Sequence, residues 1–366
     1  MYTPHWKKIA DSIRADISAG KLSTGEALLS ETELAEQWKV SRGTAHRAMH
    51  ELQRSGLVVR KRRAGTFVAE SRKPRLGQIA VLIHTGDFLE QEYLSGIRAG
   101  LPDEYDLLFC NVHCDYTREA QTLERLAAST DGILCIPTCD PHNTDQLNAL
   151  IESGTRIVFL DCMPDGVDAD AVLSDNYGGT REALQFLVAR GHRRIAHFTV
   201  NRMAISSLRE RYDAYREVMI EQGATDIYRW VREFPYDVTT RDPVHPSQAI
   251  QDALFTLMHS PERPTAIFCA HDYILSAVLQ ACQTLGLAVP EDLEIVSFND
   301  CPPFVPYLPG NVHRIVQRAH EMGQIAAERL HRRLRGETDP PEIARLAPLF
   351  YAAGEAPDRN GGSGKP

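Results

Sequence analysis

The sequence predicts an α/β protein in two unequal parts, a small helical domain with a β-hairpin and a large domain in which parallel strands alternate with helices. Three observations support this prediction. The chain has 366 residues, more than a single domain usually contains. Residues 1–73 contain 14 Lys and Arg against 8 Asp and Glu, whereas the whole chain has a formal net charge of −9. Beyond residue 77, short apolar runs alternate with helical patterns. We therefore expect a small basic domain joined to a large acidic one.

Three short helices are expected in the N-terminal domain. The first contains apolar residues with the spacing of one helix face, namely Trp6, Ile9, Ala10, Ile13 and Ile17. Ser30 and Glu33 have the spacing of a capping box that starts a second helix, and Ser41 is a suitable N-cap for a third. The outer face of the third helix carries Arg42, Gly43, His46, Arg47 and His50. Two helices joined by a tight turn, the second with a cationic outer face, suit the major groove of DNA.

A basic β-hairpin follows these helices. Residues 57–60 and 66–68 have the composition of strands, and the tip between them is basic. Four cations in a row, Arg60 to Arg63, repel one another unless they meet an anion such as a DNA phosphate. Behind a helix-turn-helix, such a hairpin makes a winged helix-turn-helix domain, with the wing placed at phosphates or in the minor groove. The alternative is a solvated run of charge on a surface loop.

Residues 4–69 resemble the DNA-binding domain of the GntR family of bacterial regulators. The similarity lies in residues 9–20, 29–35, 40–42, 56–57 and 65–68. The resemblance implies that Arg42, Thr44 and the position of His46 contact operator DNA. With the rest of the outer face and the wing, the candidate DNA-binding residues are Ser41, Arg42, Thr44, His46, Arg47, Arg62, Arg63, Gly65 and Thr66. The family usually has Arg at the position of His46. Because His cannot form the bidentate bond that Arg makes to guanine, we expect a different preferred operator.

The rest of the chain has the pattern of an α/β domain with largely parallel sheets. Buried strands are expected at residues 79–83, 106–110, 132–136, 156–160, 195–199, 266–269 and 293–298. Polar or aromatic residues follow several of them, including Asp87, Phe88, Arg211 and Asp272. An acid, a guanidinium and an aromatic ring around one cleft suit a polyhydroxylated ligand, because the charged groups bind hydroxyls and the ring packs against a sugar face. The alternatives are that Asp272 is a helix N-cap and Arg211 a surface ion pair.

Residues 77–351 resemble the effector-binding domain of the LacI/GalR regulators. The matching segments include residues 131–133, 159–164, 174–179, 187–196, 211–215, 264–272, 289–298 and 317–326. The resemblance implies a two-lobed, periplasmic-binding-protein-like (type I) α/β domain that dimerises side by side. It also implies effector contacts at Asp87, Phe88, Asp175, Ser207, Arg211 and Asp272.

The two resemblances together predict a DNA-binding transcription regulator, and the combination resembles arabinose-responsive repressors. We expect a repressor that binds a pseudo-palindromic operator as a homodimer and is released by a sugar or sugar derivative in the cleft. A nucleoside effector or a corepressor would use the same parts. The expected organisation is a DNA-binding domain at 1–69, a linker at 70–77, an effector-binding and dimerisation domain at 78–353 and a disordered tail at 354–366.

The sequence gives little support to other classes of protein. It contains no motif of a serine hydrolase or zinc peptidase, no complete phosphate loop and no dinucleotide-binding fingerprint, so we expect neither an enzyme nor a cofactor. Cys110 and Cys114, like Cys135 and Cys139, lack a second ligand pair, so no metal site is expected. Without a membrane-spanning run or the apolar core of a signal peptide, we expect a cytoplasmic protein. This expectation counts against the remaining alternative, a sugar-binding protein for transport.

Overall fold

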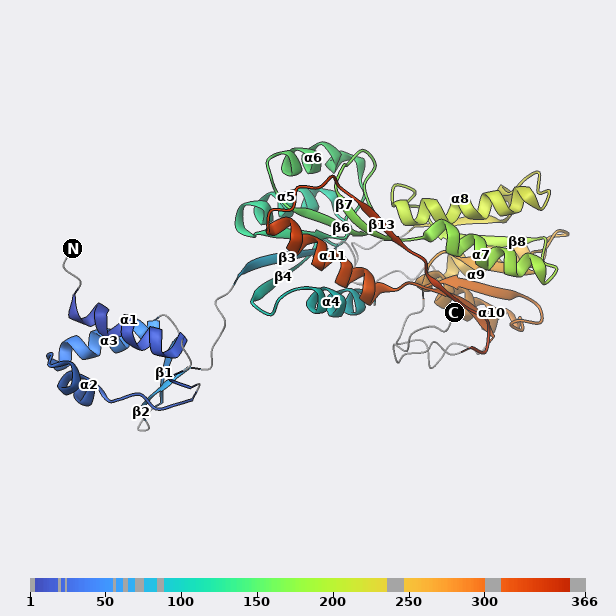
Figure 1. The fold of residues 1–366 in the computed structure, drawn as a ribbon. Helices are drawn as coiled ribbons and strands as arrows, with labels where there is room; N and C mark the ends of the chain where they lie inside the picture. The colour runs from blue at the N-terminus through green and yellow to red at the C-terminus, as the bar shows by residue number, and fades with distance from the viewer. Residues whose placement is uncertain are drawn as a thin grey trace. The chain divides into compact units, whose positions relative to one another are not determined.

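The computed structural model describes most of the chain (Figure 1). The described residues are 4–18, 21–23, 25–54, 57–61, 65–69, 76–83, 89–235, 247–299 and 311–355. The chain divides into two units, Met1–Leu76 and Gly77–Pro366, and each has a hydrophobic core of its own. Arg62, Arg63, Asp87 and Phe88, which the sequence places at the wing and the effector site, lie outside the described residues. Most of the expected linker and tail lie outside them as well.

The smaller unit is a winged helix-turn-helix, which confirms the predicted fold. Its elements are α1 (His5–Ser18), α2 (Glu31–Trp38), α3 (Arg42–Arg54), β1 (Val58–Lys61) and β2 (Gly65–Val68). The expected capping box starts α2: Ser30 Oγ accepts from the Glu33 N–H at 3.3 Å, and the Glu33 carboxylate accepts from the Ser30 N–H at 2.8 Å. The expected apolar faces of the three helices meet in one core, which includes Ile9, Leu34, Ala45, Ala48 and Leu52. The antiparallel pair of β1 and β2 forms the wing.

The larger unit contains two lobes, each built on a six-stranded sheet with helices on its faces (Figure 1). The first sheet has the order β13-β7-β6-β5-β3-β4 and is parallel throughout. Its strands are β3 (Gly77–Ile83), β4 (Tyr105–Asn111), β5 (Gly132–Cys135), β6 (Ile157–Asp161), β7 (Asp170–Ser174) and β13 (Ile343–Leu346). Its helices are α4 (Leu89–Gly100), α5 (Tyr116–Ser129), α6 (Thr144–Glu152) and α11 (Ala319–Leu334), with a 3₁₀ turn at Pro141–Asn143.

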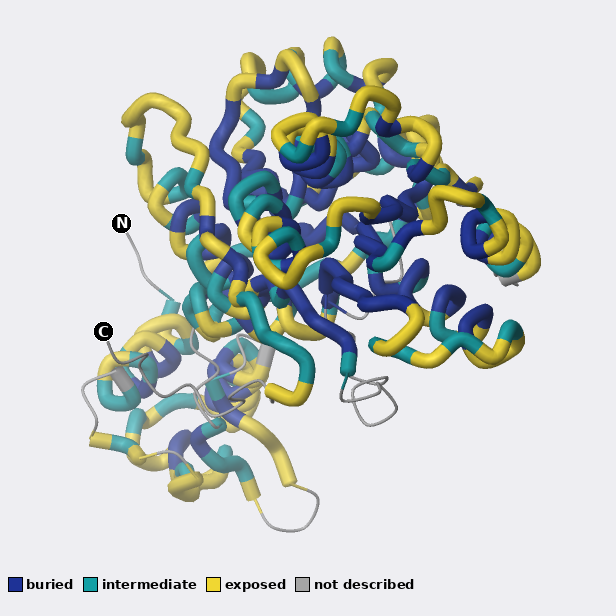
Figure 2. The backbone as a smooth tube through the Cα atoms, turned by 90° about the vertical axis from the view of Figure 1, so that its right-hand side faces the viewer, coloured by how far each residue is buried: buried dark blue, intermediate teal, exposed yellow. Residues whose placement is uncertain are grey.

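The second sheet has the order β14-β12-β11-β10-β8-β9 and is parallel except for β14. Its strands are β8 (Ile195–Val200), β9 (Val231–Phe234), β10 (Ala266–Cys269), β11 (Glu294–Phe298), β12 (Val312–Val316) and β14 (Leu349–Tyr351). Its helices are α7 (Asn176–Ala189), α8 (Ser206–Glu221), α9 (Ser247–Met258) and α10 (Asp272–Leu285), with a 3₁₀ turn at Tyr228–Trp230. Figure 2 shows that the strands of both lobes are largely buried, whereas the outer sides of the helices are exposed.

The chain passes between the lobes three times, after β7, after β12 and after β13. Helix α7 packs against α8 and β14 of the second lobe although it follows β7 directly, and α11 packs against α4 and β6 of the first lobe although it follows β12. Such interleaved lobes are typical of the predicted two-lobed, type I arrangement, and the predicted fold class is confirmed. Because parallel strands end at the same edge of a sheet, the carboxyl ends of each lobe's strands gather at one edge.

All seven strands predicted for this unit are present, with ends shifted by no more than two residues. Five further strands were missed: β7, β9, β12, β13 and β14. Polar residues weaken the apolar pattern of β7, which begins with Asp170, and of β12, which contains His313 and Arg314. These three side chains are buried, and each has a hydrogen-bond partner. His313 Nε2, for example, lies 2.7 Å from a carboxylate oxygen of Glu294. Strands β13 and β14 are short and partly exposed, and so carry little apolar signal.

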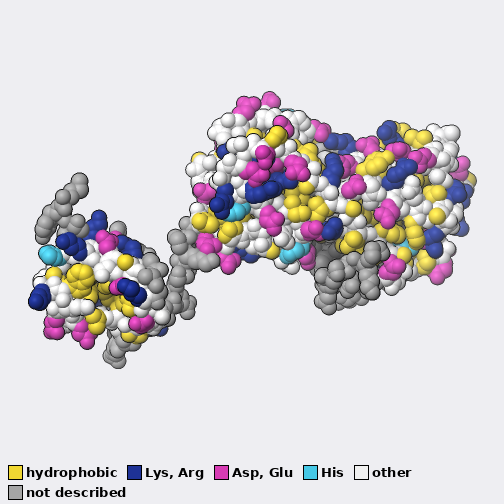
Figure 3. Space-filling view, in the orientation of Figure 1, with side chains coloured by type: hydrophobic (Ala, Val, Ile, Leu, Met, Phe, Trp, Pro, Cys, Tyr) yellow, Lys and Arg dark blue, Asp and Glu magenta, His cyan; other side chains and the backbone are white. Residues whose placement is uncertain are grey.

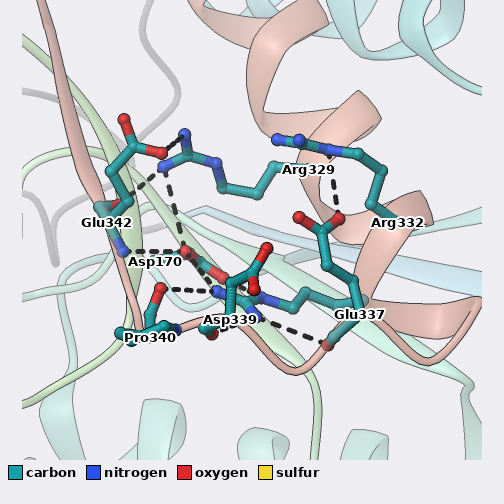
Figure 4. A network of polar contacts seen from close by, with 8 residues as sticks. Asp170, Arg329, Arg332, Glu337, Asp339, Pro340 and Glu342 are labelled. Carbon is teal, nitrogen blue, oxygen red and sulfur yellow. Dashed lines mark hydrogen bonds and ion pairs between the residues drawn. The ribbon is translucent and has the colours of Figure 1, made fainter.

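A buried ion-pair network holds the crossing segments of the first lobe together (Figure 4). Asp170, at the start of β7, accepts two bonds from Arg333 of α11, at 2.6 and 3.0 Å, and one from the Glu342 N–H at 3.0 Å. Arg329 donates to the Glu342 carboxylate at 2.6 Å. Burial acts to raise the pKa of Asp170, but the bonds from Arg333 and Glu342 outweigh it and lower the pKa below its usual value. The network therefore anchors α11 and the segment before β13 to the sheet.

Two glycines allow α4 and α11 to approach closely. A Cβ atom at Gly96 would lie 1.8 Å from the carbonyl oxygen of His320, and one at Gly323 would lie 2.4 Å from that of Tyr93. We therefore expect Gly96→Ala to lower the free energy of unfolding by about 2 kcal/mol, since backbone atoms must move apart. Urea denaturation measures this effect, with Ser95→Ala on the exposed side of the same helix as a control expected to stay within about 0.5 kcal/mol of wild type. An unchanged midpoint for Gly96→Ala would contradict the close packing of these helices.

Candidate DNA-binding surface and inter-lobe ligand site

Helix α3 carries four of the nine predicted DNA-binding residues, Arg42, Thr44, His46 and Arg47, and their side chains are exposed or half-buried. The side chains of Arg42 and His46 are 74% and 57% exposed. Arg47 is also exposed, and its guanidinium lies 4.7 Å from the ring centre of Trp6. Ser41 and Thr44 lie at the start of the helix, where Ser41 Oγ accepts from the Thr44 N–H at 3.2 Å. Figure 3 shows Lys and Arg side chains on the surface of this unit. In the described part of the unit, cationic side chains are thus exposed on α3, the helix that the sequence predicts to bind in the major groove.

The predicted wing contacts are only partly described. Gly65 and Thr66 form the start of β2, opposite Lys61 and Arg60. The cationic tip between these strands lies outside the described residues.

Sequence reasoning missed an acid in the middle of this surface. Glu31 is the first residue of α2, and one of its carboxylate oxygens lies 2.9 Å from His46 Nδ1 and 3.5 Å from Arg60 Nη1. The bond from His46 is the main reason that the pKa of Glu31 is lowered, and burial opposes it only in part. Glu31 lies between Ser30 and Glu33 of the capping motif, and its separation in sequence from His46 and Arg60 gives no signal of contact.

In the larger unit, Arg211 lies where the two lobes meet and is only 2% exposed. Its Nε donates to Asn176 Oδ1 at 2.9 Å, and its Nη1 donates to the carbonyl oxygen of Ala270 at 2.7 Å. The guanidinium lies 3.6 Å from the ring centre of Phe298 at the end of β11. These contacts fix the plane of the guanidinium, and among the described residues Nη2 has no hydrogen-bond partner. Arg211 is therefore a buried, oriented donor and not the surface ion pair that the sequence left open.

Acidic groups from both lobes surround this cation. Burial lowers the pKa of Arg211 to about 10, and the nearby charges of Asp161, Tyr93 and Asp272 oppose the shift. Asp161 ends β6 of the first lobe with a φ of 70°, and it accepts from the Tyr93 hydroxyl at 2.9 Å. At neutral pH the guanidinium therefore stays charged. We call Tyr93, Asp161, Arg211, Asp272 and Phe298 the inter-lobe site.

Asp272 is the first residue of α10 and is 3% exposed. Its Oδ1 lies 2.5 Å from His271 Nδ1 and 3.1 Å from the Tyr273 N–H. The Tyr273 N–H lies within hydrogen-bond distance of both Asp272 Oδ1 and His271 Nδ1, the latter at 3.3 Å. The residue that precedes the helix is His271, so Asp272 is not the N-cap that the sequence allowed as an alternative. One oxygen of Asp272 is thus occupied, and Oδ2 has no hydrogen-bond partner among the described residues.

Ser207 and Asp175, the remaining predicted effector residues that the structure describes, take different positions relative to Arg211. Ser207 is buried at the start of α8, one turn before Arg211. The Asp175 carboxylate caps α7, accepting from the Gly178 N–H at 2.8 Å, and it is the next residue, Asn176, that bonds to Arg211. Asp161, Tyr93, Asn176 and Phe298 had not been predicted as site residues. Asp161 could have been found, because it follows a predicted strand as Asp272 does, whereas no sequence signal marks Tyr93.

Contacts from α8 join the two lobes on either side of the site. Arg209 Nη2 lies 2.7 Å from Asp165 Oδ1, and Ser206 Oγ accepts from the Met163 N–H at 3.1 Å. Arg345 of β13 forms two bonds to Glu210, at 2.9 and 3.0 Å. A ligand that contacts Arg211 and Asp161 together would therefore favour the arrangement in which these bridges form.

The described residues contain neither a candidate metal cluster nor a candidate membrane span. Across the described residues, no cluster of three or more His, Cys, Asp or Glu side chains has the arrangement of a metal site. The described cysteines are free thiols, and five of the seven are buried. Of the helices in the described ranges, none is both long and apolar enough to cross a bilayer.

Comparison with known proteins supports the predicted domain type of each unit. Residues 6–68 match the family model of the bacterial regulatory proteins, gntR family, and residues 184–351 match that of the periplasmic binding protein-like domain. The chain is 28% identical over 245 residues to the HTH-type transcriptional regulator KdgR of Bacillus subtilis, covering 66% of this chain and 68% of that protein. It is 25% identical over 341 residues to the arabinose metabolism transcriptional repressor of Geobacillus stearothermophilus, covering 89% and 90% of the two chains.

A solved structure shows the same fold. The complex of the transcriptional regulator CelR with cellobiose aligns with a TM-score of 0.65 and 22% identity, covering 86% of this chain and 90% of that one. The relatives above are DNA-binding transcription regulators and not enzymes, in agreement with the expectation from the sequence. The chain therefore joins a gntR-type helix-turn-helix domain to a two-lobed periplasmic binding protein-like domain.

Proposed function

We propose that the protein is a transcription repressor whose affinity for operator DNA is controlled by a sugar or sugar derivative bound at the inter-lobe site. The observation that carries this proposal is the buried guanidinium of Arg211, held by Asn176 and Ala270 and flanked by acids from both lobes. A fixed guanidinium and a buried carboxylate bind hydroxyl groups well, and the ring of Phe298 adds an aromatic face. Several relatives are named as repressors of sugar metabolism, which supports the same ligand class.

DNA binding is assigned to residues 1–69, which include Ser41, Arg42, His46 and the wing, and effector binding to residues 78–353. The protein acts in the cytoplasm as a homodimer, because a pseudo-palindromic operator requires two DNA-binding domains related by a two-fold axis. Ligand binding changes the lobe arrangement and releases the operator; a ligand that instead strengthens DNA binding would identify a corepressor.

Arg42→Ala tests the DNA-binding half of the proposal. If Arg42 reads a base, the variant should bind operator DNA about 2 kcal/mol more weakly, roughly 30-fold, and non-specific DNA nearly as well as wild type does. Lys61→Ala on the wing should weaken both kinds of DNA alike and reduce the salt dependence. Fluorescence anisotropy with a DNA fragment from upstream of the protein's own gene measures both effects. Equal, small losses on both DNAs for Arg42→Ala would show that α3 is not the reading helix.

A further inference from the structure

Glu31 lies beside the guanidinium groups of Arg42 and Arg60 and the imidazole of His46 on the DNA-binding surface. Its carboxylate is 2.9 Å from His46 Nδ1, 3.5 Å from Arg60 Nη1 and 4.0 Å from Arg42 Nε. The Glu31 side chain is only 17% exposed, whereas His46, Arg42 and Arg60 are at least 57% exposed. A single acid on α2 thus contacts residues of both the recognition helix α3 and the wing strand β1.

The bond to Glu31 decides which nitrogen of His46 carries a proton. An ionised carboxylate can only accept hydrogen bonds, so Nδ1 must be protonated to donate to it. In the neutral ring the other nitrogen, Nε2, is then an acceptor with a free lone pair. Among the described residues Nε2 has no hydrogen-bond partner, and the exposed ring leaves it open to DNA. His46 therefore presents an acceptor, whereas Arg, the residue more common in the family at this position, presents donors.

We propose that Glu31 fixes the tautomer of His46, so that His46 reads an exocyclic amino group in the major groove. Adenine N6 and cytosine N4 are the donors available there, whereas guanine presents the acceptors N7 and O6 and would face the lone pair of Nε2. Glu31 is thus a positioning residue for operator specificity and acts through His46. This inference rests on the proposed function as an operator-binding repressor.

The electrostatic surroundings define the conditions for the test. The charged or titratable groups that face the His46 ring are Glu31 on α2, Arg60 on β1, and Arg42 and His50 on α3, with the His50 ring centre 6.4 Å away. A doubly protonated ring would donate from Nε2 and would suit guanine instead. Base preference should therefore be measured at pH 8, a condition chosen to favour the singly protonated ring.

Operator selection from a randomised DNA library tests the proposal directly. His46→Arg locates the base pair that this residue reads, because its preference there should change to guanine. At that position wild type should prefer adenine or cytosine over guanine by about fivefold or more, and Glu31→Ala should reduce this preference to less than about twofold. Glu31→Ala should also bind non-specific DNA more tightly, since an acid beside Arg42 and Arg60 is lost. Glu36→Ala removes an exposed acid from the same helix and should retain the wild-type preference.

A spectroscopic measurement keeps the inference testable if Glu31→Ala folds poorly. Long-range ¹H–¹⁵N spectra of the histidine rings in the full chain at pH 8 distinguish the two tautomers, and the signals missing from His46→Gln identify His46. We expect the Nδ1-protonated form. An Nε2-protonated ring, a wild-type preference for guanine or an unchanged preference in Glu31→Ala would overturn this inference alone. Absence of any sequence-specific DNA binding by wild type would instead contradict the proposed function.

Discussion

Asp272→Asn is expected to weaken binding of the effector by about 3 kcal/mol, roughly 100-fold. The carboxylate is 3% exposed, and one of its oxygens is already held by His271 and the Tyr273 N–H. The other oxygen accepts from a ligand hydroxyl in the proposed complex, and an amide in its place can present an N–H to that donor. Because the lost bond is charge-assisted and buried, its removal costs more than the loss of a neutral surface contact.

Isothermal titration calorimetry with the ligand found by a thermal-shift screen measures this loss. Glu291→Gln provides a matched control, since it removes an exposed acid from the same lobe and should bind the ligand as wild type does. Circular dichroism checks that Asp272→Asn is folded. A folded Asp272→Asn protein with wild-type affinity would show that the ligand does not bind at the inter-lobe site.

His197→Phe is expected to reduce the loss of unfolding free energy between pH 7 and pH 4 by about 3 kcal/mol. His197 lies on β8 between the rings of Tyr215 and Phe268, with both ring centres 4.9 Å away, and it is fully buried. Burial lowers the pKa of His197 to about 3; a hydrogen bond to the Phe268 carbonyl opposes this shift, and the charge of Arg211 adds to it. The ring is therefore neutral in the folded protein at physiological pH.

The sign of the pH dependence follows from this neutral ring. An unfolded histidine binds a proton near pH 6.5, whereas folded His197 does so only near pH 3. Between these values the unfolded state holds the extra proton, so the free energy of unfolding falls as the pH falls. Urea denaturation from pH 7 to pH 4 should show a steeper loss for wild type than for His197→Phe. The exposed His259→Gln should follow wild type; parallel curves for wild type and His197→Phe would mean that His197 titrates normally.

Much of the larger unit could be predicted because its buried strands are short, strongly apolar runs. The β10 run from Ala266 to Cys269 is fully buried, and its bounds agree with the prediction. The same reasoning located Asp272 and Arg211, since side chains just beyond parallel strands gather at one edge of the sheet. The capping box at Ser30 was equally clear, because its two hydrogen bonds depend on residues only three positions apart.

The parts that could not be predicted depend on contacts between residues far apart in sequence. Strand β7 begins with the acid Asp170, which is buried only because Arg333, 163 residues further along the chain, bonds to it. Tyr93 enters the inter-lobe site through a bond to Asp161 that no local pattern indicates. Asp175 and Asn176 are adjacent, and only the geometry of the turn decides that Asp175 caps α7 while Asn176 holds Arg211. Glu31 likewise lies within a capping motif in the sequence, whereas in the folded protein it contacts His46 of the DNA-binding surface.

The most direct test of the central claim is the affinity for an upstream DNA fragment at fixed salt, with and without sugars, sugar acids and nucleosides, for wild type and Asp272→Asn. We predict that one ligand changes the affinity of wild type by about tenfold or more, within the usual range of coupling between two sites. We also predict that the same concentration of this ligand has no effect on Asp272→Asn. Tight DNA binding that no ligand alters, or a ligand effect that persists in Asp272→Asn, would contradict control of the operator from the inter-lobe site.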